Sequence, residues 1–243
     1  MRRYLALSAA ALALAVPASA NAGTPGFVDV NLGTIDAGAA DLTTVGVGGT
    51  VVAPLSGNWH AQFDGEFTRY ESDGGLTLSG SGLAAHIFHD GGDWAVGALL
   101  GYQSLSELTF WTLGAEAQYT VGAFVLEGGL GIGTAESLSS NADTFSANAS
   151  ATWFANADLS FTGGISFIDV ESEIEATNYS LDVEYRFAGS PFSVIGGYTF
   201  TDYEGGTEGD TWSIGLRYGF GDGTLQARRN EGPRWLREDS FIY

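Results

Sequence analysis

The 243-residue chain contains no cysteine and no lysine, and its nine basic residues, all arginine, stand against 29 acidic ones. Without cysteine, disulfide scaffolds and cysteine-ligated metal sites are excluded. The formal net charge of −20 would repel phosphate, which argues against nucleic acid as a partner. Aromatic residues make up 13% of the chain, more than disordered proteins carry. These limits leave a single folded domain of about 200 residues.

Long apolar runs are also missing, except near the N-terminus. Arg2 and Arg3 precede an apolar run at 5–16, and small residues follow at 18–22. This order is typical of a secretory signal peptide, so we expect residues 1–22 to be cleaved and the chain to be exported. Beyond this segment no stretch approaches the ~20 apolar residues that a membrane helix needs. Two classes remain, a soluble exported β-protein and a membrane β-barrel.

Apolar residues recur at every second position through most of the chain. In the segment 176–187, for example, Leu181 and Val183 alternate with Asp182 and Glu184. A period of two predicts strands, and these runs reach the ~10 residues that a tilted strand needs to cross a bilayer. One bulge is predicted at 80–83, where the alternation slips. The predicted strands are 26–35, 42–53, 59–70, 76–88, 94–104, 108–120, 123–134, 144–154, 159–168, 176–187, 192–203 and 211–220.

The connections between these segments alternate in character. The even-numbered connections, such as 121–122 and 155–158, are short. The odd-numbered connections, such as 135–143 and 201–210, are more acidic and often longer. Transmembrane barrels have short periplasmic turns, longer outer loops and an even number of strands. The predicted fold is therefore all-β, a closed antiparallel transmembrane β-barrel of about 12 strands within residues 23–220. Ten and fourteen strands are the alternatives.

Charge and aromatic residues are sorted by position as well. No acidic residue takes a lipid-facing position inside a predicted strand, where it would cost a few kcal/mol. Aromatic residues gather at strand ends, as in the interfacial girdles of membrane barrels. One girdle is predicted from Trp59, Trp94, Tyr185, Phe187 and Phe220, and the other from Tyr70, Tyr102, Trp111, Tyr198, Phe200 and Trp212.

Charged residues with inward parity are the candidate pore lining. Rings of carboxylates concentrate cations, so a water-filled lumen of this kind would favour positive or neutral solutes. The alternative is a filled interior in which the arginines neutralise the acids, because a barrel of intermediate strand number can be open or filled. The predicted pore-lining residues are Asp64, Glu66, Glu116, Glu127, Asp182, Glu184, Arg186 and Arg217.

The last predicted strand carries a recognisable pattern. Ser213 and Gly215 precede Tyr218 and Phe220, two aromatic residues spaced by one. This resembles the terminal-strand assembly signal of Gram-negative outer-membrane proteins, and the chain as a whole resembles a small porin-type outer-membrane β-barrel protein. The resemblance implies passive diffusion of small solutes across the outer membrane, and no cofactor. It also implies contact with outer-membrane lipid, lipopolysaccharide and the barrel-assembly machinery. Many such barrels are trimers, so the resemblance is compatible with a homo-oligomer.

Residues 221–243 extend past this pattern as a C-terminal periplasmic tail with no net charge. Such a tail can plug the acidic lumen, dock on a periplasmic partner or be disordered, and disorder is the default expectation.

Two other functions stay open at this stage. One is a non-conducting structural or adhesive surface barrel, whose acidic loops at 169–175 and 202–210 would meet partners. These loops lack the ligand spacing of calcium sites, so no metal site is predicted. The other is an outer-membrane hydrolase that acts on lipid or peptide. His60 beside Asp64 suggests it, although a hydrogen-bonded pair in the lumen is the favoured interpretation of these two residues. No catalytic residue is predicted, because the partners of a catalytic triad meet only in the folded chain.

Overall fold

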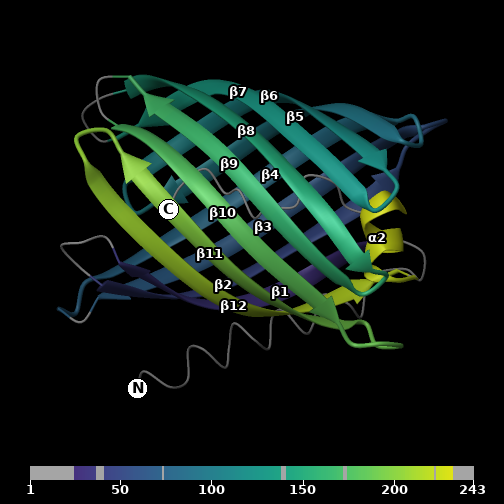
Figure 1. Ribbon diagram of the computed structural model, residues 1–243. Helices are drawn as coiled ribbons and strands as arrows, with labels where there is room; N and C mark the ends of the chain where they lie inside the picture. The colour runs from purple at the N-terminus through teal and green to yellow at the C-terminus, as the bar shows by residue number, and fades with distance from the viewer. Residues whose placement is uncertain are drawn as a thin grey trace.

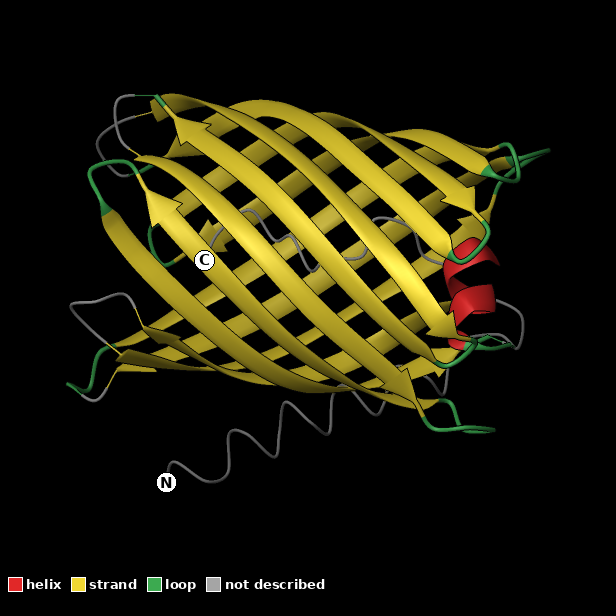
Figure 2. Cartoon of the chain, in the orientation of Figure 1, coloured by secondary structure: helices red, strands yellow, loops and turns green. Residues whose placement is uncertain are grey.

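The computed structural model describes residues 25–36, 41–72, 74–137, 141–171, 174–221 and 223–231. Twelve antiparallel strands form one closed barrel, in which each strand pairs with its sequence neighbours and β1 pairs with β12 (Figure 1). A short helix, α2, lies at one end of the barrel (Figure 2). The elements are β1 (Gly26–Asp36), β2 (Asp41–Pro54), β3 (Trp59–Ser72), β4 (Thr77–Asp90), β5 (Trp94–Leu105), β6 (Leu108–Val121), β7 (Phe124–Glu136), β8 (Asn141–Asn156), β9 (Leu159–Val170), β10 (Ile174–Arg186), β11 (Phe192–Tyr203), β12 (Thr207–Phe220) and α2 (Leu225–Glu231).

The predicted number of strands and their antiparallel closure are confirmed. The predicted signal peptide, residues 1–22, lies outside the described residues. Within the described part of the chain, no helix has the length and apolar character required to cross a bilayer.

The expected difference in connection length is wrong. The strands continue past their apolar parts into acidic hairpins, where Asp202 still pairs with Glu208 across β11 and β12. Backbone hydrogen bonds need no apolar side chains, so the ladders extend until a tight turn closes them. The connection between β11 and β12 is consequently reduced to 204–206. The two ends of the barrel differ in charge instead. We call the end that carries acidic hairpins such as 202–208 the acidic end, and the end where α2 lies the helix end.

The predicted bulge at 80–83 is also wrong. The pairing of β4 with β3 and with β5 runs through this segment without a register shift. The slip in alternation has a different cause, which is a pair of serines on the outer face. Ser81 and Ser104 lie opposite each other, and their hydroxyl groups are joined by a hydrogen bond of 3.1 Å. A register shift does occur in β8, between Phe154 and Asn156.

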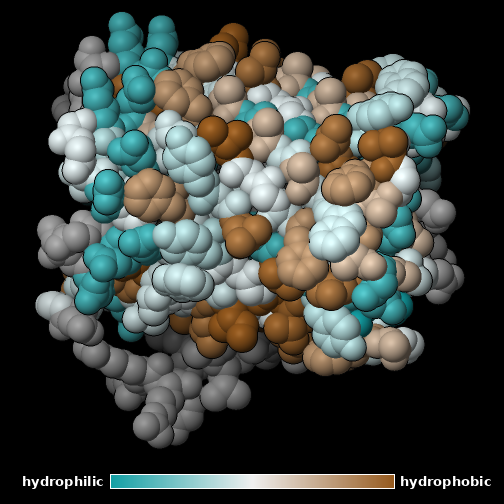
Figure 3. All heavy atoms as spheres, in the orientation of Figure 1, coloured by the Kyte–Doolittle hydropathy of each residue, from teal (hydrophilic) through white to brown (hydrophobic). Residues whose placement is uncertain are grey.

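The outer surface of the barrel is apolar. Large side chains such as Leu83 and Ile132 are 64% and 63% exposed, whereas in a soluble protein most side chains of this kind are buried in the core. In Figure 3 hydrophobic side chains cover much of the visible face, and hydrophilic ones gather toward the acidic end at the left. Aromatic pairs lie near both ends, with Tyr198 against Trp212 at the acidic end. Tyr70, expected in that girdle, lines the interior instead, because it shares the inward parity of Glu66.

Candidate functional site

The interior of the barrel carries the polar side chains, and the structure separates the predicted pore-lining residues into clusters. All eight occupy inward-facing positions, although their role in a pore stays a prediction. They lie as follows: Asp64 and Glu66 in β3, Glu116 in β6, Glu127 in β7, Asp182, Glu184 and Arg186 in β10, and Arg217 in β12.

The first cluster lies where the first strand, β1, pairs with the last strand, β12. Arg217 donates from Nη2 to Asp29 Oδ2 at 3.0 Å and from Nη1 to Glu184 Oε2 at 2.9 Å. Its guanidinium carbon lies 4.0 Å from the centre of the Phe27 ring. All three charged side chains are buried, and Ser193 also donates to Glu184. The guanidinium of Arg217 thus links β12 to β1 and β10, and its positive charge lies beside both carboxylates.

The second cluster is built around His86, which sequence analysis did not select. His86 Nε2 lies 2.6 Å from Asp64 Oδ2, and Nδ1 lies 2.8 Å from Glu116 Oε1. A neutral imidazole carries one N–H, so two close carboxylates require either the imidazolium or a protonated carboxyl. Gln62 donates to both oxygens of Asp64 at 3.2 Å. The inward parity of His86, which pairs with Gln62 across β3 and β4, is the signal that could have selected it.

This geometry bears on the hydrolase hypothesis. Both ring nitrogens of His86 face carboxylates, so neither is placed to take a proton from a serine hydroxyl. His60, the histidine that the sequence favoured, stacks on Phe88 with ring centres 5.2 Å apart. The arrangement is that of a structural acid–imidazole network between β3, β4 and β6.

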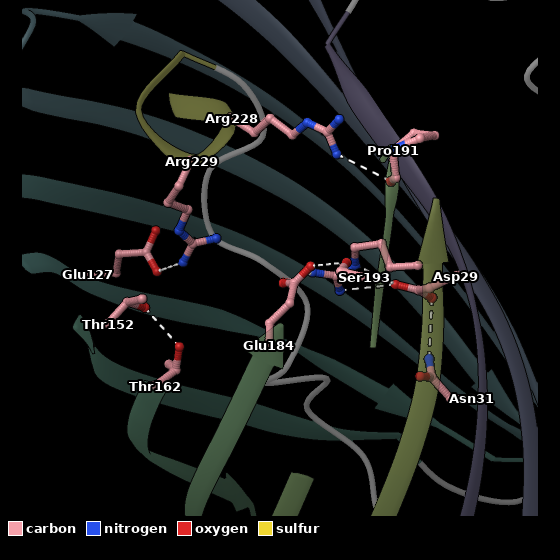
Figure 4. A network of polar contacts seen from close by, with 11 residues as sticks. Asp29, Asn31, Glu127, Thr152, Thr162, Glu184, Pro191, Ser193, Arg228 and Arg229 are labelled. Carbon is pink, nitrogen blue, oxygen red and sulfur yellow. Dashed lines mark hydrogen bonds and ion pairs between the residues drawn. The ribbon is translucent and has the colours of Figure 1, made fainter. Parts of the chain in front are cut away.

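The third cluster lies at the mouth of the helix end. Arg229 of α2 forms an ion pair with Glu127, and both side chains are about nineteen-twentieths buried. Arg228 donates to the Pro191 carbonyl at 3.4 Å, and burial together with the nearby charge of Arg186 lowers the pKa of Arg228 below its ordinary value. Figure 4 shows the two arginines of α2 pointing to different parts of the barrel wall. Disorder, the default expectation for residues 221–243, is therefore wrong for 225–231.

The two halves of the interior differ in how densely they are filled. Toward the helix end, inward side chains are buried on strand after strand, among them Val52, Gln62, Phe88 and Val125. Toward the acidic end lies a cavity of about 170 Å³. Its polar lining includes Asp29, Asn31, Thr44, Glu66, Thr68, Tyr70, Gln103, Asp182, Thr199, Thr211, Ser213 and Arg217.

A closed antiparallel barrel with an apolar exterior and a polar interior is the architecture of outer-membrane β-barrel proteins. No protein-family model matches the chain, and no curated protein does. Among solved structures it is similar to the COG4313 outer membrane channel from Pseudomonas putida F1 (TM-score 0.61, 14% identity, 83% of this chain and 97% of that one). It is also similar to the NanC porin (0.60, 14%, 79% and 98%) and to the translocator domain of autotransporter NalP from Neisseria meningitidis (0.52, 15%, 88% and 95%). At these identities the likeness shows the fold alone.

Proposed function

We propose that the chain forms a porin-like channel in the outer membrane, through which small cationic or neutral solutes diffuse passively. The observation that carries this proposal is the polar cavity inside an apolar-walled barrel. Among the described residues that line it, three carboxylates, those of Asp29, Glu66 and Asp182, accompany one arginine, Arg217. Arg217 is itself paired with Asp29 and Glu184. Negative potential in a narrow polar lumen raises the local concentration of cations and repels anions. Two of the similar structures are named as a porin and a channel, which agrees with this proposal.

The proposal includes an orientation and a set of partners. The acidic end would face outward toward lipopolysaccharide, and the helix end, where β1 begins and β12 ends, would face the periplasm. The apolar band would contact outer-membrane lipid. The barrel-assembly machinery would recognise the final strand through Ser213, Gly215, Tyr218 and Phe220, which lie in β12. A homo-oligomer is compatible with this arrangement.

A planar bilayer tests the channel. The mature chain, residues 23–243, is refolded in detergent and its current is recorded across a salt gradient. We expect discrete current steps with a cation-selective reversal potential. The double variant Glu66→Gln/Asp182→Asn should reduce that selectivity, because it removes two lumen charges. The matched control Arg69→Gln/Glu71→Gln removes an ion pair on the outer face and should leave selectivity unchanged. Anion-selective steps would refute the proposal.

A second function is favoured by the dense packing at the helix end. Buried inward side chains there, together with α2, would suit a non-conducting surface barrel that acts through its acidic end. Folded protein that is silent in every variant, including those that release α2, would support this alternative. The next measurement would then be binding of outer-surface partners before and after shortening of the acidic hairpins.

A further inference from the structure

The helix α2 lies at the mouth of the helix end and contacts several connections of the barrel rim. Gln226 donates from its side chain to the Gly122 carbonyl at 3.2 Å and from its backbone to the Ala157 carbonyl at 3.3 Å. Arg228 reaches the Pro191 carbonyl, on the connection between β10 and β11. The helix therefore touches three of the tight connections that border this mouth, and it lies at this end of the barrel (Figure 2).

The Arg229–Glu127 ion pair differs from these contacts. Gln226 and Arg228 bind the rim through carbonyl groups, whereas Arg229 reaches inward to a carboxylate on the barrel wall (Figure 4). Ser150 holds the same Glu127 oxygen from β8, at 3.4 Å. The pair is buried, so removing either partner takes away the opposite charge that the other faces in a buried position.

A helix of seven residues is too short to be stable on its own in water. Its folded state must therefore depend on the contacts with the rim and on the ion pair. A short segment outside the sheet opens at a lower free-energy cost than the strands of a barrel. These observations together describe a closure that can be undone while the barrel stays intact.

We propose that α2 is a latch that closes the helix end of the lumen, and that the Arg229–Glu127 ion pair holds it shut. Release of the pair frees the helix and uncovers the helix end of the lumen. In the closed state Arg229 occupies, from within the chain, a carboxylate that a cationic solute would otherwise meet. The proposal rests on the proposed channel function, and its test separates the two.

Single-channel recording of charge variants is the first measurement. Glu127→Gln and Arg229→Gln should each raise the open fraction about tenfold or more, because each breaks a buried pair. The swapped variant Glu127→Arg/Arg229→Glu should restore closure, which a simple loss of packing would not do. Arg69→Gln, at an exposed pair on the outer face, is the matched control and should behave as wild type. Equal open fractions in all of these proteins would overturn the latch.

A cross-linking measurement gives a readout independent of current. The chain has no cysteine, so the pair Ala157→Cys/Gln226→Cys introduces the only two thiols. A hydrogen bond joins the backbones at these positions, which brings the two residues close enough for a disulfide to be tested. Under mild oxidation the disulfide should form quickly, and it should form several-fold more slowly when Glu127→Gln is added, because the helix is then often released. In the triple variant, the oxidised form should be closed and the reduced form open.

The two readouts distinguish the failures. If cross-linking depends on Glu127 but no variant conducts, the result supports the latch and contradicts the channel function. If every variant conducts equally and cross-linking ignores Glu127, the channel stands and the latch is refuted.

Discussion

Replacement of Arg217 by methionine should destabilise the barrel more than any loss of an exposed charge. Methionine keeps much of the volume but removes the donors that Asp29 and Glu184 share. Both carboxylates are buried, with 7% and 6% of their surfaces exposed, so the substitution leaves two negative charges without the cation that they share. Breaking a buried ion pair in this way costs about 3–5 kcal/mol. We expect a loss in that range in the free energy of unfolding.

The assay is urea unfolding of the protein in lipid vesicles, followed by tryptophan fluorescence. Arg69→Met is the control, since Arg69 and Glu71 form an exposed pair at 2.7 Å, and such pairs contribute about 0–1 kcal/mol. The triple variant Asp29→Asn/Glu184→Gln/Arg217→Met should recover most of the loss, because no charge is then left unpaired. An Arg217→Met protein as stable as the Arg69→Met control would refute the reasoning, and so would a triple variant less stable than Arg217→Met alone.

Two further predictions concern the wall of the barrel. A methyl group added at Gly133 would lie 1.8 Å from the Trp111 carbonyl oxygen, whereas one at Gly163 meets nothing within 4 Å. Gly133→Ala should therefore cost about 1–3 kcal/mol and Gly163→Ala should stabilise by roughly 0.5–1 kcal/mol, as measured by the same unfolding assay; the opposite order would contradict this packing. Leu83→Arg places a charge at the middle of the apolar band and should cost ~2–4 kcal/mol, against ~0–1 kcal/mol for Thr109→Arg near the acidic end. Equal losses of folded, heat-modifiable protein on gels would argue against a membrane-spanning band.

Much of the fold follows from local patterns that a strand imposes. Successive side chains in a strand point to opposite faces, so the alternation around Leu181 and Asp182 predicts both a strand and the face that each residue takes. The same rule places the charged residues on the inner face and predicts twelve strands without knowledge of any long-range contact. It failed where the outer face itself is polar, as at Ser81, because polarity then no longer distinguishes the two faces.

The sequence by itself therefore determined the class of fold, the inward set of charges and the apolar exterior, because these depend on a period of two and on composition. Only the tertiary structure decided which charges meet. Arg217 and Asp29 are 188 positions apart and become neighbours when β12 closes on β1. His86 of β4 contacts Asp64 of β3 and Glu116 of β6. Arg229 contacts Glu127 from a helix that no periodic pattern in the sequence predicted. Such contacts are set by closure and register, which act over the whole chain rather than within any segment of it.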